Sequence, residues 1–238
     1  MRTGIFVQVR LGSTRLPRKA LLPLPGGNMI QHVMRSLALV PADVRALLTD
    51  KASAEELLPF AEGEGYAVFA GPERDVLARY CMACRAYAVS RVVRVTGDNP
   101  LTSASLAVKI LGEHAARGAD LSHYLGCPLG TGVEVVEAAA LFEAERDATA
   151  PDEREHITTF LYRHPERFAI HEPLAPASTR LADAATPSPA GFTPHVSVDT
   201  RDDFDRIRSI FDALYIGRPL EAHEVVRWLQ CQRGEKPA

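Results

Sequence analysis

A polar segment near the amino terminus carries the residue types that hold phosphate groups. Directly after an apolar run at residues 4–9, the chain reads Arg10-Leu11-Gly12-Ser13-Thr14-Arg15-Leu16-Pro17-Arg18-Lys19. Guanidinium forks, an ammonium group and hydroxyls bind spread negative charge well. The segment has neither the Walker spacing nor G-x-G-x-x-G. It therefore predicts a phosphate-binding loop of another kind, with a solvated basic turn as the alternative.

Two aspartates follow other apolar runs and could hold a metal ion. Asp98 comes after residues 91–96, and Asp199 comes after residues 195–198. Each has a structural alternative, an Asx-turn for Asp98 and a helix N-cap for Asp199. Mg²⁺ favours one or two carboxylates, with substrate phosphates and waters as its other ligands. Together with the cationic loop, the two carboxylates predict a site for magnesium and a triphosphate.

These side chains need a scaffold that brings strand ends together. Short apolar runs predict strands at residues 4–9, 44–49, 67–70, 91–96, 120–124, 133–136 and 195–198. Helical patterns cover residues 29–39, 52–64, 75–89, 103–117, 138–146, 152–163, 201–214 and 222–230. This alternation predicts an α/β fold with a mainly parallel sheet and helices on both faces. Ligands of such sheets bind beyond the carboxyl ends of the strands, where the loop and both aspartates would lie.

Composition narrows the classes of function. A length of 238 residues suits one domain spanning residues 1–238, and a net charge of −3 argues against a nucleic-acid partner. No apolar run approaches the roughly 20 residues of a membrane-spanning helix, so no membrane partner is expected. Four cysteines are too few for a disulfide framework, which predicts a cytoplasmic protein. Residues 173–194 form a Pro-rich loop, for which a flap and a surface excursion are equally open accounts.

The spacing Cys81-Met82-Ala83-Cys84 looks like half of a zinc site, but no second pair follows it. Structural zinc needs four ligands, so two cysteines on a buried helix face are the better interpretation.

Five segments in order resemble the spore coat polysaccharide biosynthesis cytidylyltransferases, relatives of the CMP-Kdo and CMP-sialate synthetases. The first is the segment at residues 7–19, and it includes the basic loop. The others are residues 69–80, Thr96-Gly97-Asp98-Asn99-Pro100-Leu101, Arg154-Glu155-His156-Ile157-Thr158 and Val198-Asp199-Thr200-Arg201-Asp202-Asp203-Phe204. The resemblance implies a GT-A-like (Rossmann-like) nucleotidyltransferase fold, CTP and an anionic acceptor as substrates, Mg²⁺ as cofactor, and a homodimer.

The resemblance also implies roles for individual residues. Arg15 and Lys19 would hold the triphosphate, and Asp98 would act with them in catalysis and share a metal with Asp199. The residues expected around the nucleotide are Gln8, Arg10, Gly12, Ser13, Gly71, Asp75, Arg79 and Thr96. The residues expected toward the acceptor are Glu134, Arg154, Glu155 and His156, of which the last three could instead face a dimer partner. For Glu134 a solvated strand edge is equally open, as is a structural hydrogen bond for His156.

Two positions depart from the family pattern. Arg18 stands where the family usually has glycine, so the loop is either stiffer or gains a phosphate contact. Gly132 stands where an acidic residue is common, which bears on the acceptor more than on the nucleotide.

The expected reaction is transfer of CMP from CTP to a sugar acid, or to a small phosphonate or phosphate, with release of pyrophosphate. One alternative is a metal-dependent GT-A glycosyltransferase, because Asp203-Phe204-Asp205 has the Asp-x-Asp form. That string lies within a helical pattern, where a solvated helix face explains it better. The other alternative is a non-catalytic nucleotide-binding regulator.

Overall fold

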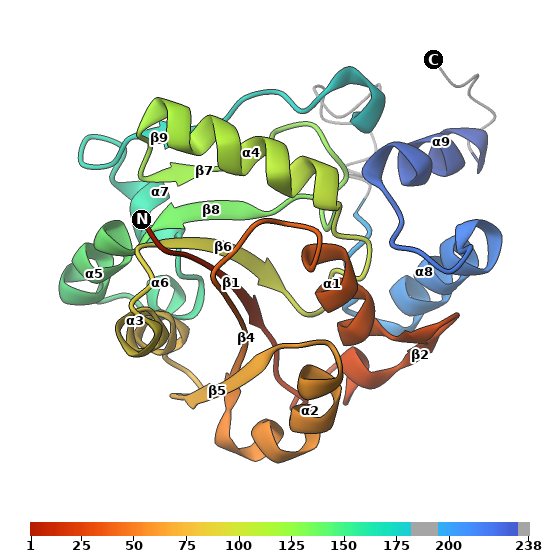
Figure 1. Cartoon of the computed structure of the whole chain (residues 1–238), viewed down its shortest axis with the longest axis horizontal. Helices are drawn as coiled ribbons and strands as arrows, with labels where there is room; N and C mark the ends of the chain where they lie inside the picture. Colours follow the sequence, from red (N-terminus) through yellow and green to blue (C-terminus); the bar gives the residue numbers. More distant parts are fainter. Residues whose placement is uncertain (182–194, 233–238) are drawn as a thin grey trace.

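The computed structural model of the chain describes residues 1–181 and 195–232. Seven strands form one sheet in the order β5-β4-β1-β6-β8-β7-β9 (Figure 1). Their bounds are Thr3–Gln8 (β1), Val44–Asp50 (β4), Ala67–Gly71 (β5), Arg91–Thr96 (β6), Leu121–Ser122 (β7), Glu134–Glu137 (β8) and Ile170–His171 (β9). A separate hairpin pairs Pro23–Leu24 (β2) with Gly27–Asn28 (β3).

Among the described strands of the sheet, β8 alone runs against the others. Strands β5, β4, β1 and β6 are parallel, so their carboxyl ends lie at one edge. Strand β8 runs antiparallel to β6 and to β7. The polar segments that follow β1 and β6 therefore emerge side by side, and β8 begins beside them.

Helices cover both faces of the sheet because its strands are apolar on both sides. Val7 and Val93 pack on one face with α1 (Met29–Leu37), α2 (Lys51–Gly63) and α4 (Ala104–Arg117). Phe6 and Val92 pack on the other face. That face is covered by α3 (Val76–Tyr87), α5 (Ala138–Asp147) and α7 (Thr159–Arg163), with α6 (Pro151–Glu155) against α3.

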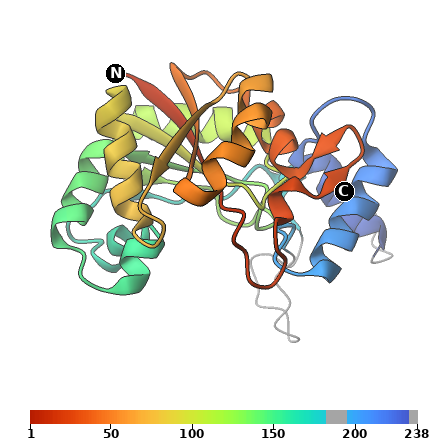
Figure 2. The same cartoon turned by 90° about the horizontal axis from the view of Figure 1, so that it is seen from below.

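The last two helices join the amino-terminal part of the chain. Helices α8 (Arg201–Leu214) and α9 (Ala222–Gln232), blue in Figure 1, lie beside the red segment that contains the β2–β3 hairpin and α1. Figure 2 shows the same arrangement from below. Phe204, Phe211 and Val225 form a separate apolar cluster with Leu24 and Met29. This cluster fixes the start of α8 close to the loop that follows β1.

Most predicted elements are confirmed, with ends that differ by no more than two residues. Three predictions were wrong in part. Residues 120–124 form only the two-residue strand β7, and residues 195–198 form no strand but an isolated bridge between His195 and Leu129. The helix expected at residues 152–163 is two short helices, because His156 is extended and ends α6. The sequence analysis missed β9 and the β2–β3 hairpin.

Two other expectations concern the prolines and cysteines. Within the Pro-rich loop, residues 173–181 include the short 3₁₀ helix Ala177–Thr179, while residues 182–194 lie outside the described residues. Cys81 and Cys84 are buried in the apolar cluster under α3, which confirms that they are core residues. Among the described residues, no helix is long and apolar enough to cross a membrane.

Candidate active site

A cavity of about 360 Å³ opens beyond the carboxyl ends of β1 and β6. It is lined by residues from five separate parts of the chain: Gln8, Val9, Arg10, Ser13, Thr14, Arg15, Lys19, Ala20, Glu73, Val76, Arg79, Arg94, Thr96, Gly97, Asp98, Glu155, His156 and Asp199. Most of the polar residues expected at the site therefore share one cavity. They come together because parallel strands end at the same edge of a sheet.

The loop after β1 is closed by backbone contacts and ends in a short 3₁₀ helix at Lys19–Leu21. The amide of Arg18 donates to the carbonyl of Leu11 at 3.0 Å, and the amide of Leu11 donates to the Ser53 hydroxyl at 3.0 Å. This closure places the side chains of Ser13 and Arg15 along the cavity. The loop thus offers hydroxyl and cationic groups from a fixed backbone.

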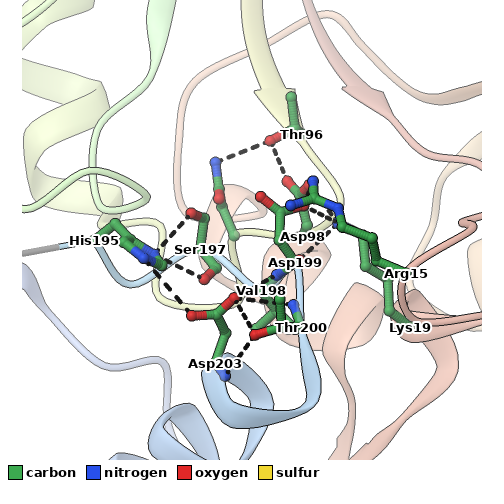
Figure 3. Close-up of polar contacts among 11 residues, drawn as sticks. Arg15, Lys19, Thr96, Asp98, His195, Ser197, Val198, Asp199, Thr200 and Asp203 are labelled. Carbon is green, nitrogen blue, oxygen red and sulfur yellow. Dashed lines mark hydrogen bonds and ion pairs between the residues drawn. The ribbon is translucent and has the colours of Figure 1, made fainter.

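Lys19 lies where the two candidate metal ligands meet. Its Nζ donates to Asp98 Oδ2 at 2.9 Å, to Asp199 Oδ1 at 2.9 Å and to the carbonyl of Val198 at 2.6 Å (Figure 3). Arg15 reaches the same oxygen of Asp199 at 3.0 Å. The Lys19 side chain is 13% exposed, whereas that of Arg15 is 65% exposed. Lys19 is therefore an internal cation of the site and Arg15 an outer one.

Asp98 is held by the turn that follows β6. Its Oδ1 accepts from the Thr96 hydroxyl at 2.5 Å, and Asn99 Nδ2 donates to that hydroxyl at 2.9 Å. Gly97 must be small, because a Cβ there would stand 2.9 Å from the Cβ of Val9. The turn can therefore pack against the β1 loop and direct the Asp98 carboxylate at Lys19.

Asp199 is held by the first turn of α8. Asp203 Oδ2 accepts from the amide of Asp199 at 3.1 Å and from the amide and hydroxyl of Thr200 at 2.9 and 2.8 Å (Figure 3). Burial raises the pKa of Asp203, but these hydrogen bonds lower it by a larger amount. The pKa of Asp203 therefore lies below its usual value. Thr200, not Asp199, is the N-cap of the helix. The Asp199 carboxylate is consequently free of the capping role that its position suggested.

Thr200 and Asp203 also account for the Asp-x-Asp string. Asp203 is buried in the capping box, and Asp205 forms a surface ion pair with Arg201. Asp203 is therefore not the solvated residue that was expected, while Asp205 is. Neither residue lines the cavity.

The wall formed by β1 and α3 contains buried polar atoms without partners. Gln8 Oε1 and Arg79 Nε are buried and have no hydrogen-bond partner among the described residues. Arg79 Nη1 donates to the carbonyl of Pro72 at 2.7 Å, and burial lowers the pKa of this guanidinium. Gly71 lets the Arg79 side chain pass, since a Cβ at residue 71 would stand 2.8 Å from Arg79 Cγ. Such atoms are suited to meet the polar edge of a ligand.

Another part of the lining comes from the end of α6, which packs against α3. The break at His156 turns Glu155 and His156 into the cavity lining. The neighbouring Arg154 points elsewhere, because it forms an ion pair with Asp75, the N-cap of α3. The helix break that the sequence analysis missed is thus what places two of the predicted residues.

Five of the predicted site residues do not line the cavity: Gly12, Gly71, Asp75, Glu134 and Arg154. Conversely, the sequence analysis gave no role to Arg94, which does line it, together with Thr14 of the predicted phosphate-binding loop and Glu73 of the segment at residues 71–75. Arg94 had a signal, because it is a cation within an apolar central strand. Arg18 lies outside the lining, where its side chain forms an ion pair with Glu56.

Comparison with known proteins agrees with this arrangement. The family model described as cytidylyltransferase matches residues 5–207. The spore coat polysaccharide biosynthesis protein SpsF of Bacillus subtilis (strain 168) is 29% identical over 231 residues, which cover 94% of this chain and 92% of that protein. The 3-deoxy-manno-octulosonate cytidylyltransferase of Aeromonas hydrophila is 25% identical, with 87% of this chain and 97% of that protein covered.

Solved structures show the same fold. A cytidylyltransferase from Leptospira borgpetersenii superposes with a TM-score of 0.86 at 21% identity, covering 98% of this chain and 96% of that one. CMP:2-keto-3-deoxy-manno-octonic acid synthetase, solved with CTP, gives a TM-score of 0.66 at 14% identity over 90% and 99% of the two chains. The nucleotidyltransferase fold expected from the sequence is confirmed. The matched residues extend over most of the chain, and on this basis the protein belongs to the cytidylyltransferase family.

Proposed function

We propose that the protein transfers CMP from CTP to a small anionic acceptor and releases pyrophosphate. The observation that carries this proposal is the cluster in which Lys19 Nζ lies 2.9 Å from both Asp98 and Asp199 inside the cavity. Two carboxylates and a lysine at this position suit a triphosphate with its metal. Arg15, Ser13 and Thr14 line the same end of the cavity and add donors for phosphate oxygens.

Asp98 and Asp199 fit Mg²⁺ by the chemistry of their donor atoms. Both present carboxylate oxygens to one point, and hard oxygen ligands are what Mg²⁺ prefers. Among the described residues, no cluster of three or more His, Cys, Asp or Glu side chains could hold a metal. A two-carboxylate site leaves room for substrate phosphates and waters, which is the usual arrangement for Mg²⁺. Bound there, the ion would neutralise charge on the phosphate oxygens.

The chain's own residues would act mainly by positioning and by charge. An acceptor oxygen attacks the α-phosphorus of CTP in line with the bond to the β-phosphate, and pyrophosphate leaves as that bond breaks. Lys19 and Arg15 would stabilise the negative charge that moves onto the pyrophosphate. A phosphonate or phosphate acceptor is already an anion and needs no general base. A sugar-acid hydroxyl must also lose a proton.

The proposal predicts a preference for CTP. Gln8 Oε1, buried without a partner in the described structure, is an acceptor suited to the cytosine amino group. UTP would set a carbonyl against it, and an unpaired buried polar group costs about 1–3 kcal/mol. We expect kcat/KM for CTP to exceed that for UTP by at least roughly tenfold, or about 1.4 kcal/mol.

Pyrophosphate release measured with each of the four nucleoside triphosphates, Mg²⁺ and a panel of anionic acceptors tests both points. The panel should contain sugar acids, a phosphonate and inorganic phosphate. Faster turnover with UTP or GTP would refute the cytidylyl assignment. Release of a sugar from a sugar nucleotide, without pyrophosphate, would refute nucleotidyl transfer altogether.

A further inference from the structure

The floor of the cavity carries a second cationic surface, apart from the loop after β1. Arg94 of β6 and Arg79 of α3 both line the cavity. Arg79 is 1% exposed, and the Arg94 side chain is 16% exposed. Both guanidinium groups are close enough to Tyr80 to lower its pKa, against the larger rise caused by burial. Two buried cations therefore line this cavity in addition to those of the β1 loop.

These two cations have only one carboxylate partner among the residues that the structure describes. Arg94 Nη1 donates to Glu134 Oε2 at 2.5 Å, whereas Arg79 donates to a backbone carbonyl and forms no ion pair there. The Nε atoms of both arginines are buried without partners in the same described part. An uncompensated buried charge is costly, and an anion that entered the cavity would offset this cost.

The Glu134 carboxylate also accepts hydrogen bonds from residues that do not line the cavity. Its Oε1 accepts from the Tyr162 hydroxyl at 3.0 Å and from the Thr158 hydroxyl at 3.1 Å. Burial raises the pKa of Glu134, but Arg94, His123 and the Tyr162 hydroxyl hold it below its usual value. The register places Glu134 directly opposite Arg94 across β6 and β8. Since Glu134 does not line the cavity, its carboxylate holds the Arg94 guanidinium in place and is not available to a substrate.

Arg94 lies on the acceptor's side of the cavity. The triphosphate has its own cations, Arg15 and Lys19, and cytosine is uncharged, so neither needs a further cation at this depth. Arg94 stands on β6 two residues before Thr96 and opposite Glu134 of β8. Glu134 in turn accepts from Thr158, two residues after His156 in the chain.

We propose that Arg94 binds the anionic group of the acceptor and that Glu134 is a positioning residue for its guanidinium. This inference rests on the proposed function, because it assigns the second substrate of that reaction. The planar fork of arginine matches both carboxylate and phosphate oxygens. The shared chemistry is therefore a compact oxyanion, and the experiment must separate a carboxylate from a phosphonate or phosphate.

Calorimetry on the full chain can measure this step without turnover. The protein is loaded with Mg²⁺ and an α,β-methylene analogue of CTP, which cannot transfer CMP. It is then titrated with 3-deoxy-manno-octulosonate, with N-acetylneuraminate, with methylphosphonate and with inorganic phosphate. The same probes are titrated into the protein without nucleotide.

The main variant is a double one, so that replacing Arg94 does not leave the Glu134 carboxylate buried without its partner. Arg94→Met combined with Glu134→Gln removes both charges, and Glu134→Gln alone keeps the guanidinium but weakens its support. Arg91→Met combined with Glu137→Gln is the matched control. Arg91 and Glu137 form the same kind of cross-strand pair on β6 and β8, at 2.6 Å, and do not line the cavity.

We expect at least one probe to bind the wild type and to bind the Arg94 double variant at least roughly tenfold more weakly, as when a charged hydrogen-bond donor is lost. Glu134→Gln should weaken binding by about threefold to tenfold, and the control pair should match the wild type. The affinity for the CTP analogue should stay within about threefold in all variants.

Three results would overturn the inference. They are no binding of any probe to the wild type, unchanged probe binding in the Arg94 double variant, and loss of the CTP analogue when Arg94 is replaced. The last would make Arg94 a nucleotide-binding residue. Failure of the wild type to bind the CTP analogue would instead refute the proposed function itself.

Discussion

Lys19 bridges the carboxylates of Asp98 and Asp199, which lie 101 positions apart in the chain. Replacing either aspartate by asparagine keeps its shape and removes one charge from the proposed metal site. We expect each variant to lose turnover by at least about 100-fold, because the charge of such a site supplies several kcal/mol of transition-state stabilisation. Pyrophosphate release measures the loss, and circular dichroism checks the fold.

A variant that retained turnover within about threefold of the wild type, roughly 0.65 kcal/mol, would show that this aspartate is only a turn residue.

The cations of the β1 loop should differ sharply in their effects. Lys19→Ala and Arg15→Ala should lower kcat by a factor on the order of 10²–10³, as when one preorganised donor to a developing charge is lost. Arg18→Gly should leave kcat nearly unchanged, because Arg18 lies outside the cavity lining and pairs with Glu56.

Arg18 has a backbone φ of 58°, in the left-handed region that glycine adopts without strain. The free energy of unfolding of Arg18→Gly should therefore lie within about 1 kcal/mol of the wild-type value, because the relief of backbone strain offsets the loss of the surface ion pair. Equal losses of kcat at all three positions would make Arg18 a phosphate ligand.

The polar residues at strand ends were predictable, whereas the direction of individual side chains was not. The sequence places Asp98 directly after an apolar run, and parallel strands then bring it to the β1 loop. Asp75 and Arg154 fit the same family pattern, yet they form an ion pair with each other, and neither side chain lines the cavity. Arg94 reaches the cavity because its partner Glu134 stands opposite on β8, a pairing between distant segments that no local pattern reveals.

At the scale of elements, the first turn of α8 determines where Asp199 lies. Asp203→Ala removes the acceptor of three hydrogen bonds from Asp199 and Thr200, so it should destabilise the fold by about 1–2 kcal/mol and also lower turnover. Asp205→Ala is the matched control, because Asp205 lies on the same helix in an exposed pair with Arg201. Thermal unfolding and pyrophosphate release should separate the two variants.

The control also bears on the glycosyltransferase alternative. A metal-holding Asp-x-Asp would make Asp205→Ala as damaging to turnover as Asp203→Ala. That result would contradict the capping role given to Asp203.

Long periodic elements were predicted well, and short or non-local ones were not. Helix α8 matches its predicted residues 201–214 because a capping box starts it and an apolar stripe runs along it. Residues 195–198 have the composition of a strand, but their backbone pairs with turns and not with another strand. The amide of Val196 donates to Leu129, and that of Val198 donates to Asp98. Gly130 permits this approach, since a Cβ there would stand 2.9 Å from the amide of Ser197.

For the molecule as a whole, the cavity joins segments from residue 8 to residue 199. A ligand that bridges these segments binds the folded state alone, so CTP with Mg²⁺ at about 100 times its Kd should stabilise the fold by about 2.7 kcal/mol. For a chain of this size the midpoint of thermal unfolding should rise by roughly 5–10 °C. Differential scanning calorimetry with and without a chelator measures how much of this stabilisation depends on the metal. An equal rise after Mg²⁺ has been removed would contradict the assignment of Asp98 and Asp199.

The reversed strand β8 also divides the walls of the cavity by position in the chain. Of the lining, the loop after β1, the start of α3 and the end of β6 all precede residue 100, whereas the end of α6 and Asp199 follow it. Strand β8, whose Glu134 holds Arg94, also follows it. On the proposed assignment, nucleotide recognition is encoded mainly in the first part of the gene, with Asp199 as the exception. The surroundings of Arg94 are encoded largely by codons 134–163. Acceptor preference can then diverge among descendants through changes in this short stretch while the use of CTP is inherited unchanged. The same stretch is the natural unit to exchange in chimaeras of two relatives with different acceptors.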